Sequence, residues 1–489
     1  MRVSLYTALV VLLFASCGSE ETCTCSGGLP CGTVWLDSSP WGEVGPEDDA
    51  TVHESGPVDQ VGLPDVAVAD WLPLEDVAVD LWLEHDLADP DIPKADDIIP
   101  DLPPEPTQDG TPEFPFMVDE FPFLHWDDTT TAITAMMDVY SCADWLGEEG
   151  NEVYYKVTLP VGATLKAEVA EEDGVDVDLH LLTSLNLDGG MATDCLLRAN
   201  TQLVAPELEA GDYWLVIDSY SEDGNMWPGA YKLALEIEVW DEWQEKQVAD
   251  GVNWRKKKYA DYAGGIQTIN VLEVDLQNPG VTVKPYWGNG CIHPSEVAQS
   301  EGAVGAINMG FFSGGCTSLC LIRTDGELKV TNKIDGNPRR SFGLTEANAP
   351  MFESVDAGAD WPESWQAMGG HPNLVTDGAI DIWPWSDTGF YTSRHPRTGL
   401  GATADGRLLL VTVDGRTEAG KGMTEEELAQ HMIWLGAVDA INLDGGGSTS
   451  MFVEEMSING IVSHPSDNET PDHHGERLVS DAILVFSNN

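Results

Sequence analysis

The feature that most restricts the fold of this chain is an apolar segment near its C-terminus that ends in an aspartate and three glycines. Residues 440–443 (Ala-Ile-Asn-Leu) predict a short buried strand, because apolar side chains run almost unbroken up to a cluster of chain breakers. The residues that follow the strand are Asp444, Gly445, Gly446, Gly447 and Ser448. Glycines let the backbone adopt positive φ and approach a ligand closely, with amides facing an anion. We therefore expect a carboxylate held rigidly beside a glycine-lined site; a plain turn capped by Asp444 is the alternative.

The distribution of charge limits the partners of the chain. Its 489 residues include 23 Lys and Arg against 84 Asp and Glu, a formal net charge of -61. Nucleic acid and anionic membrane surfaces repel such a chain, so neither is expected as a partner. Sixteen of the basic residues lie after position 250. A site for an anionic substrate is expected only there.

The first seventeen residues have the pattern of a secretory signal. A positive start is followed by the apolar run 5–14, which is too short to span a bilayer. Phe14-Ala15-Ser16-Cys17 resembles the bacterial lipobox, which would make Cys17 the lipidated first residue of the mature protein. Ordinary cleavage that leaves Cys17 as a plain thiol is the alternative. Because Gly18 is not acidic, we expect export across the inner membrane and anchoring to the outer membrane, facing the periplasm or the cell surface.

The remaining eight cysteines favour disulfides, since their number is even and the expected compartment is oxidising. The close pairs Cys23/Cys25 and Cys316/Cys320 resemble metal spacing, but no histidine is near enough in sequence to complete a zinc site. We expect Cys142 to pair with Cys195, because both lie in one domain that has no other cysteine.

Residues 18–116 are expected to form a disordered acidic linker. Positions 41–110 hold twenty Asp or Glu, a single lysine and many prolines. Self-repulsion and proline keep such a segment extended. The linker would serve as a solvated spacer, although its Trp and Leu content leaves weak docking onto a neighbour open.

Residues 117–240 are expected to form an all-β sandwich. Short alternating segments separated by turn residues occur at 153–159, 165–169, 175–182 and 213–218. Residues 150–157, 176–182 and 211–218 resemble the pre-peptidase C-terminal-like domain, which accompanies secreted hydrolases and mostly binds or positions. Asp176 and Asp178 could bind calcium, but exposed strand charges are the favoured interpretation. We assign no catalysis to this domain.

The C-terminal half combines strands, glycine turns and a helix. Asn308 lies in an apolar run, so it either braces a loop or contacts a ligand. Thr424 and Glu427 form a capping-box pattern that predicts a helix running to about Leu435. That helix leads the chain into the strand before Asp444.

Six motifs occur in one order along this half of the chain. They are Asn-Met-Gly-Phe-Phe (308–312), Pro-Arg-Thr (396–398), Val-Asp-Gly-Arg (413–416), Gly-Met-Thr (422–424), Asn-Leu-Asp-Gly-Gly-Gly-Ser (442–448) and Gly-Glu-Arg (475–477). Together they resemble the phosphodiester glycosidase family. The resemblance covers roughly residues 250–489 and implies an α+β domain that hydrolyses sugar-1-phosphodiesters. The whole chain is then multidomain, with the sandwich and this domain following the linker.

The implied substrate is an anion, and it suggests roles for particular side chains. Arg397 and Arg477 are the candidates to clamp the phosphate, assisted by Ser448 and the amides of Gly445, Gly446 and Gly447. Asn308 would hold a sugar hydroxyl or the phosphate. His371 stands where the family more often has glycine and could alter the choice of substrate.

Acid–base catalysis needs one or two carboxyl groups. Asp444 and Glu476 are the expected pair, with Asp414 and Asp377 in reserve. The simpler alternatives are an ion pair between Glu476 and Arg477 that braces the final turn, and a turn carboxylate at Asp414. No cofactor is certain; Asp-rich loops suit calcium or magnesium, but no ligand set is legible.

The function predicted from the sequence is hydrolysis of sugar-1-phosphodiester bonds in cell-surface or extracellular glycans such as exopolysaccharide. A polysaccharide-binding lipoprotein without catalysis is one alternative. A phosphodiesterase that releases sugar-1-phosphate is the other.

Overall fold

The structure is a computed structural model. It describes residues 108–488 apart from 133–134, 144–148, 223, 334–338 and 383–388. The expected signal segment, Cys17, the first three of the other cysteines and nearly all of the acidic linker lie outside the described residues. Those that are described belong to one compact unit, Pro93–Asn489.

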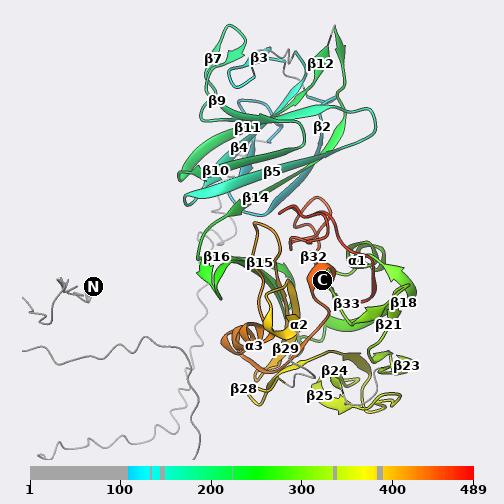
Figure 1. Cartoon of the computed structure of the whole chain (residues 1–489). Coiled ribbons are helices and arrows are strands. Elements are labelled where there is room, and N and C mark those ends of the chain that lie inside the picture. The colour runs from blue at the N-terminus through cyan, green and yellow to red at the C-terminus, as the bar shows by residue number, and fades with distance from the viewer. Residues whose placement is uncertain are drawn as a thin grey trace, which may run out of the picture. The chain divides into compact units, whose positions relative to one another are not determined.

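The first part of the described chain is a β-sandwich (Figure 1). One sheet has the order β1-β4-β11-β6-β9 and the other β10-β5-β14-β2. The strands of both sheets are β1 Phe116–Val118, β2 Phe123–Asp128, β4 Glu152–Leu159, β5 Ala163–Glu171, β6 Val177–Leu182, β9 Cys195–Ala199, β10 Gln202–Leu208, β11 Gly211–Ser219 and β14 Ala230–Glu238. Burial alternates along β5 and β14, because one face of their sheet meets the core and the other meets solvent.

Shorter strands complete this part. They are β3 Val139–Tyr140, β7 Leu187–Asp188 and β8 Met191–Ala192 in one small sheet, and β12 Ser221–Glu222 and β13 Asn225–Met226 in another. Cys142 is bonded to Cys195 (S–S 2.06 Å), which confirms the expected pairing. Asp178 is not the exposed strand charge that we expected. It is fully buried on β6, and Arg198 contacts its carboxylate at 2.6 Å, since a buried carboxylate requires a partner.

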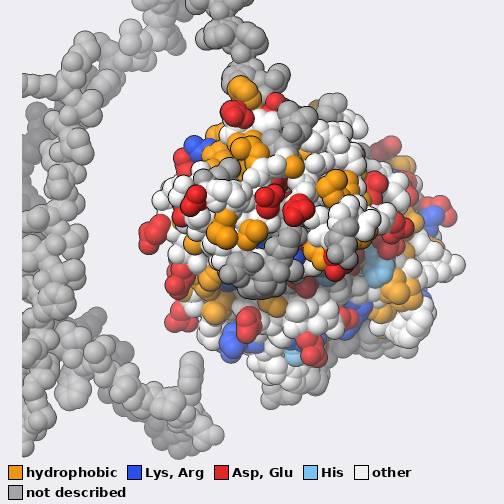
Figure 2. Space-filling view, turned by 90° about the horizontal axis from the view of Figure 1, so that it is seen from above, with side chains coloured by type: hydrophobic (Ala, Val, Ile, Leu, Met, Phe, Trp, Pro, Cys, Tyr) orange, Lys and Arg blue, Asp and Glu red, His pale blue; other side chains and the backbone are white. Residues whose placement is uncertain are grey.

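The surface of the described chain mixes acidic and apolar side chains. Figure 2 shows one face, on which red Asp and Glu side chains are scattered among orange hydrophobic ones. No helix within the described residues is long and apolar enough to cross a membrane.

Three main sheets form the C-terminal part (Figure 1). The largest has the order β15-β16-β17-β30-β29-β31-β27-β28; the others are β18-β33-β19-β32 and β23-β22-β26-β24-β25. The strands of the largest sheet are β15 Trp243–Ala249, β16 Val252–Tyr262, β17 Gly265–Asp275, β27 Asn373–Thr376, β28 Ala379–Ile380, β29 Arg397–Thr403, β30 Arg407–Val413 and β31 Ala437–Asn442. Those of the other two are β18 Val281–Ile292, β19 Gly305–Asn308, β22 Ile322–Thr324, β23 Glu327–Val330, β24 Arg339–Leu344, β25 Pro350–Val355, β26 Gln366–Gly369, β32 Met451–Val453 and β33 Val479–Ser487. A small hairpin joins β20 Phe312–Ser313 to β21 Thr317–Ser318.

Helices are few and short in this part. They are α1 Pro294–Glu301, α2 Gly389–Thr392, α3 Glu425–Trp434 and the 3₁₀ turn η2 Gly446–Ser448. The capping box predicted for α3 is present: Thr424 accepts from the Glu427 amide, and Glu427 reaches back to the Thr424 amide. Strands hold far more residues than helices, so the structure supports a multidomain, mainly β architecture. The α+β class expected for the C-terminal domain is not confirmed.

The centre of the largest sheet is covered on both faces, which explains why β29 and β30 are buried almost throughout. Leu428 and Met432 of α3 pack against it on one side. On the other side its residues share a core with strands of the β18-β33-β19-β32 sheet, for example Leu410 with Ile307 and Ile483. This packing brings the ends of β19 and β31 and the start of β29 to one place.

A second disulfide joins Cys291 to Cys316. Cys316 is therefore not bonded to Cys320, its near neighbour in sequence, and Cys320 is buried.

Candidate functional site

The backbone around Asp444 is fixed by three neighbouring segments. The Leu443 amide donates to the Thr398 carbonyl (2.8 Å), the Asp444 amide to the Met309 carbonyl (2.9 Å) and the Gly446 amide to the Pro396 carbonyl (2.8 Å). The residue at the end of β31 is thereby tied to the end of β19 and the start of β29. The sequence prediction of a rigidly placed strand end agrees with this geometry.

Asn308 braces this junction. Its side-chain amide donates to the Asp444 carbonyl at 2.6 Å. Its side-chain oxygen accepts from the Thr398 hydroxyl (2.8 Å) and the Ser450 amide (3.2 Å). The residue is fully buried, so the structure favours the loop-bracing alternative over direct contact with a ligand.

Two guanidinium groups lie against the glycine turn. Gly446 has φ +64°, and a Cβ there would lie 2.9 Å from Arg416 Nη2. A Cβ on Gly447 would lie 2.1 Å from Arg477 Nη2 and 2.0 Å from an Asp467 carboxylate oxygen. Glycine suits the positive φ of Gly446, and a side chain at either position would displace these charged groups.

The guanidinium groups of Arg416 and Arg477 are partly exposed, so some of their N–H groups can reach a ligand. Arg477 donates to both Asp467 oxygens (2.6 and 2.7 Å), and its side chain is 40% exposed. Arg416 is exposed, and its Nη2 lies 3.1 Å from His395 Nδ1. Positive charge on such planar groups suits a phosphate.

The surroundings of Asp444 favour its protonated, neutral form over the charged carboxylate. Burial raises its pKa to about 6, while Ser448, the Gly445 amide and Arg477 oppose the rise and the charge of Asp481 adds to it. A carboxyl with a pKa near 6 can both release and accept a proton close to neutral pH.

Asp481 is the carboxyl that the sequence analysis did not assign. It lies on β33 beside the end of β19, and its oxygens accept from the Gly310 amide and the Ser480 hydroxyl, each at 2.6 Å. Burial raises its pKa to about 6 as well. Asp481 could have been found from the sequence, because it directly precedes the apolar segment 482–486, just as Asp444 directly follows the apolar segment 440–443.

Glu476, the expected partner of Asp444, has other contacts. Its carboxylate accepts from the Ser295 hydroxyl (2.5 Å) and amide (3.3 Å) at the start of α1, and from the Ser450 hydroxyl (2.6 Å). Burial raises its pKa, and these hydrogen bonds oppose the rise. A carboxylate at a helix N-terminus is favourable by itself. The carboxylate whose charge raises the pKa of Asp444 is therefore that of Asp481, and Arg477 acts in the opposite direction.

Arg397 faces the interior. Its side chain is fully buried, forms an ion pair with Glu425 and donates to the carbonyls of Met423 (2.8 Å), Phe390 (2.6 Å) and Ser393 (3.0 Å). These contacts occupy the guanidinium, since a buried charge must be fully paired. Arg397 is therefore not placed as the expected clamp, whereas Arg416, which the sequence showed only as part of the motif 413–416, lies against Gly446 of the turn.

Asp414 and His371 contact other groups. Asp414 is buried and binds His464, with 2.6 Å between a carboxylate oxygen and Nδ1 and 3.0 Å to the His464 amide. His371 lies at the end of β31, where its amide donates to the Asn442 carbonyl (2.8 Å) and its Nε2 lies 2.8 Å from the Tyr391 hydroxyl.

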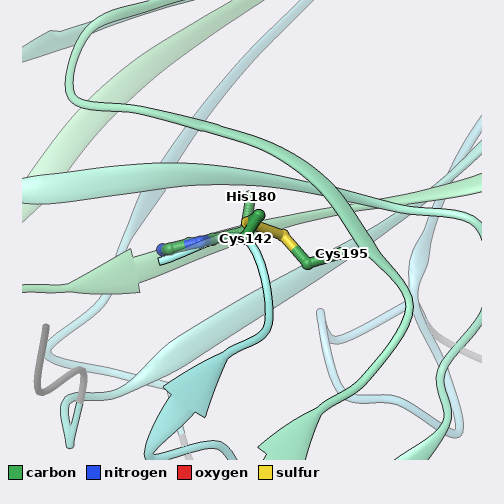
Figure 3. A group of neighbouring side chains, drawn as sticks. All are labelled: Cys142, His180 and Cys195. Carbon is green, nitrogen blue, oxygen red and sulfur yellow. A yellow bond between two sulfur atoms is a disulfide. The ribbon is translucent and has the colours of Figure 1, made fainter. Parts of the chain in front are cut away.

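Two groups of side chains within the described residues have metal-ligand composition, and neither includes Asp444, Asp481 or Glu476. In the group of Cys142, His180 and Cys195 the two sulfurs are bonded to each other (Figure 3), so they are not available as thiolate ligands. The second group is Glu236, His464 and His473.

Residues 301–486 are similar to a known protein family. They match the family model described as phosphodiester glycosidase. The N-acetylglucosamine-1-phosphodiester alpha-N-acetylglucosaminidase of Bos taurus is 44% identical over 189 residues, 35% of this chain and 34% of that protein. The enzyme of the same name from Mus musculus is 35% identical over 227 residues, 42% of this chain and 40% of that protein. The resemblance seen in the sequence is confirmed for this region.

A prophage-derived uncharacterized protein of Bacillus subtilis is 38% identical over 143 residues, 29% of this chain and 19% of that protein. The chain thus spans well under half the length of these relatives. The solved catalytic domain of the zebrafish enzyme is 22% identical, with a TM-score of 0.41 over 50% of this chain and 88% of that one.

Proposed function

We propose that this chain, whose residues 301–486 belong to the phosphodiester glycosidase family, hydrolyses the bond between a sugar and its phosphodiester at the Asp444 site. The observation that carries the proposal is that the guanidinium groups of Arg416 and Arg477 lie against the glycine turn that follows Asp444, a carboxyl whose pKa burial raises to about 6 and on which the charge of the buried Asp481 acts. Anion binding and proton transfer are the two requirements of this reaction, and the turn offers groups for both.

The phosphodiester would bind to Arg416 and Arg477 and to amides of the turn, which match its charge. Water attacks the anomeric carbon, the bond from that carbon to the phosphate oxygen breaks, and a phosphate monoester leaves. A carboxylate of the Asp444 and Asp481 pair accepts the proton of the water. The phosphate is already a good leaving group, so it needs little protonation.

The substrate in this proposal is a sugar-phosphate-containing glycan outside the cell. The lipobox-like Phe14-Ala15-Ser16-Cys17 supports a lipid anchor as the only attachment to a membrane. Exopolysaccharide and related surface glycans are the substrates within reach of a protein anchored in this way.

The test uses the exported full chain and an aryl or uridine diphosphate N-acetylglucosamine phosphodiester. Release of free sugar that is lost in Asp444→Asn supports the proposal. Asp241→Asn is the control, because Asp241 is exposed and its positive φ of 60° suits asparagine. Sugar-1-phosphate as product would reveal a phosphodiesterase instead, and binding without turnover would reveal a polysaccharide-binding protein.

A further inference from the structure

A second cluster of reactive side chains lies away from the Asp444 turn. One carboxylate oxygen of Glu236 and one ring nitrogen each of His464 and His473 lie within 4.8 Å of one another. Glu236 belongs to β14 of the sandwich, whereas both histidines belong to the segment between β32 and β33. The two imidazole rings are stacked, with centroids 4.8 Å apart.

Both histidines are oriented through the nitrogen that faces away from Glu236. His464 Nδ1 lies 2.6 Å from an Asp414 oxygen, and His473 Nδ1 lies 2.9 Å from the Ser463 carbonyl. Histidines that bind metals usually donate their second N–H to a carboxylate or a backbone carbonyl in this way. The arrangement leaves Nε2 of His464 to accept a ligand bond, and Nε2 of His473, which lies 3.3 Å from a Glu236 oxygen, would exchange that contact for a shared ion.

The Nε2 atom of His464 is an unsatisfied polar atom. The side chain is 1% exposed, and among the described residues Nε2 has no hydrogen-bond partner. Such burial costs free energy unless something fills the position. Asp414 binds the opposite side of the ring, so the ring cannot turn to satisfy Nε2 without giving up that contact.

We propose that Glu236, His464 and His473 bind one divalent transition-metal ion, with Zn²⁺ the best match. Two imidazoles and one carboxylate are a common zinc set, whereas calcium and magnesium prefer oxygen ligands. His473 Nε2 and a Glu236 oxygen are 3.3 Å apart, the spacing of about 3.3 Å expected for two ligands at about 2.0–2.1 Å from one tetrahedral ion.

Access and a fourth ligand are available. Glu236 and His473 line a pocket of about 90 Å³ between the sandwich and the C-terminal part. That is room for several waters, since one needs about 10–15 Å³. A water could complete the coordination.

Two lysines near Glu236 determine how it could bind the ion. Lys256 Nζ lies 2.8 Å from Oε2, and Lys166 Nζ lies 3.3 Å from Oε1 but 2.7 Å from Glu238. An ion at Oε1 therefore leaves Lys256 on Oε2 and Lys166 on Glu238.

The expected consequence concerns the candidate active site. Asp467 lies between His464 and His473 in sequence and binds Arg477 through two hydrogen bonds. An ion held by both histidines would fix the ends of the segment that carries Asp467. The metal would therefore order this side of the site and join it to β14.

The test measures metal binding by the folded full chain. After removal of metal with a chelator, Zn²⁺ is titrated and bound metal is counted by mass spectrometry, with Co²⁺ absorption reporting the ligand field. We expect one ion per chain, and at least about tenfold weaker binding in His473→Ala and in Glu236→Gln. His474→Ala is the matched control, because the imidazole of His474, next to His473 in sequence, contacts Glu168 (2.6 Å) and not Glu236.

Thermal unfolding separates loss of the ligand from loss of the fold. Zn²⁺ should raise the melting temperature of the wild type and of His474→Ala, and leave that of folded His473→Ala unchanged. His473 is preferred to His464 for truncation because its side chain is 11% exposed. Equal binding by all variants, or no stoichiometric binding by the wild type, would overturn the proposal. Neither result depends on glycosidase activity.

Discussion

Burial raises the pKa of Asp444, and the charge of the fully buried Asp481 adds to the rise. Both pKa values are about 6. Close to pH 6 each of the two carboxyl groups is therefore partly ionised. Such a pair can accept a proton from water while the phosphate remains bound to the arginines.

Asp444→Asn should lower kcat by at least about 100-fold, because the amide cannot exchange the proton. In the wild type, kcat/KM should rise with pH up to about 6, as the acceptor carboxylate ionises. That dependence should disappear from the residual activity of the variant. Rates from pH 4.5 to 8 measure both effects. A wild-type profile that is flat across pH 6 would remove these carboxyls from the mechanism.

Asp481→Asn should stabilise the protein at high pH. The folded pKa of Asp481, about 6, is above the unfolded value near 3.9. The folded state thus binds more protons between these values, and wild-type stability falls as pH rises from about 4 to 6. At pH 8 the asparagine avoids the buried charge, a gain on the order of 2 kcal/mol. Urea unfolding at pH 4 and pH 8 would check it; the difference should vanish at pH 4.

Arg397 and Arg477 should respond oppositely to truncation. Arg397→Met leaves Glu425 buried without its partner and should cost about 3–5 kcal/mol of stability. Arg477→Met removes a half-exposed ion pair and should cost less than about 1 kcal/mol. Its kcat/KM should nonetheless fall about 10–100-fold, because a charged hydrogen bond to the phosphate is lost. Calorimetry and initial rates on the same preparations separate the two roles.

The direction of these side chains explains what the sequence left undecided. A strand that starts at Arg397 can be read from the sequence, but the face on which the guanidinium lies depends on α2 and α3 packing beside it. Asn308 could be recognised as unusual in an apolar run, whereas its bracing role required knowledge of Thr398 and Ser450 as neighbours. No residue close to Asp481 in the sequence suggests a role for it, because its partner Gly310 lies 171 residues away.

At the scale of elements, local signals identified β31, β30 and α3. The apolar run before Asp444 and the capping box at Thr424 are local patterns that the structure reproduces. The sheet order is not local: β29 lies between β30 and β31 although α3 separates them in sequence. The neighbours of Glu476 are likewise not local, since its contact with Ser295 of α1 spans 181 residues.

Gly447→Ala tests the turn as an element. The new Cβ would overlap the Arg477 and Asp467 side chains, so their ion pair must move out of the site. We expect kcat/KM to fall at least about tenfold, with little change in stability because φ at this position is not positive. Gly290→Ala is the control, since a Cβ there meets no atom within 4 Å. Equal activity of the two variants would argue against a role for Arg477.

At the scale of the whole molecule, buried charges join the sandwich to the C-terminal part. Glu236 and Glu238 of β14 meet Lys256 and Lys258 of β16 at 2.8 and 2.6 Å. The sequence predicted the sandwich and its disulfide, because alternation and cysteine count are legible without neighbours. The basic run 255–258 is evident in the sequence, but nothing in the sequence indicates that β14 supplies its partners.

The ion pairs of Glu236 and Glu238 with Lys256 and Lys258 form a charged seam, from which we predict that the sandwich and the C-terminal part separate in acid. Burial alone would raise the pKa of Glu238, but Lys166, Lys256 and Lys258 lower it to about 2. The unfolded value is near 4.3, so the stabilisation is complete above that pH and is lost as pH falls toward 2. Glu238→Gln should therefore cost about 2–3 kcal/mol at pH 7 and almost nothing at pH 2. Calorimetry of the wild type should show one transition at pH 7, while the variant should resolve into two; Glu209→Gln, an exposed change, should behave as wild type. A variant that unfolds in one unshifted transition at pH 7 would show that the seam does not couple the two parts.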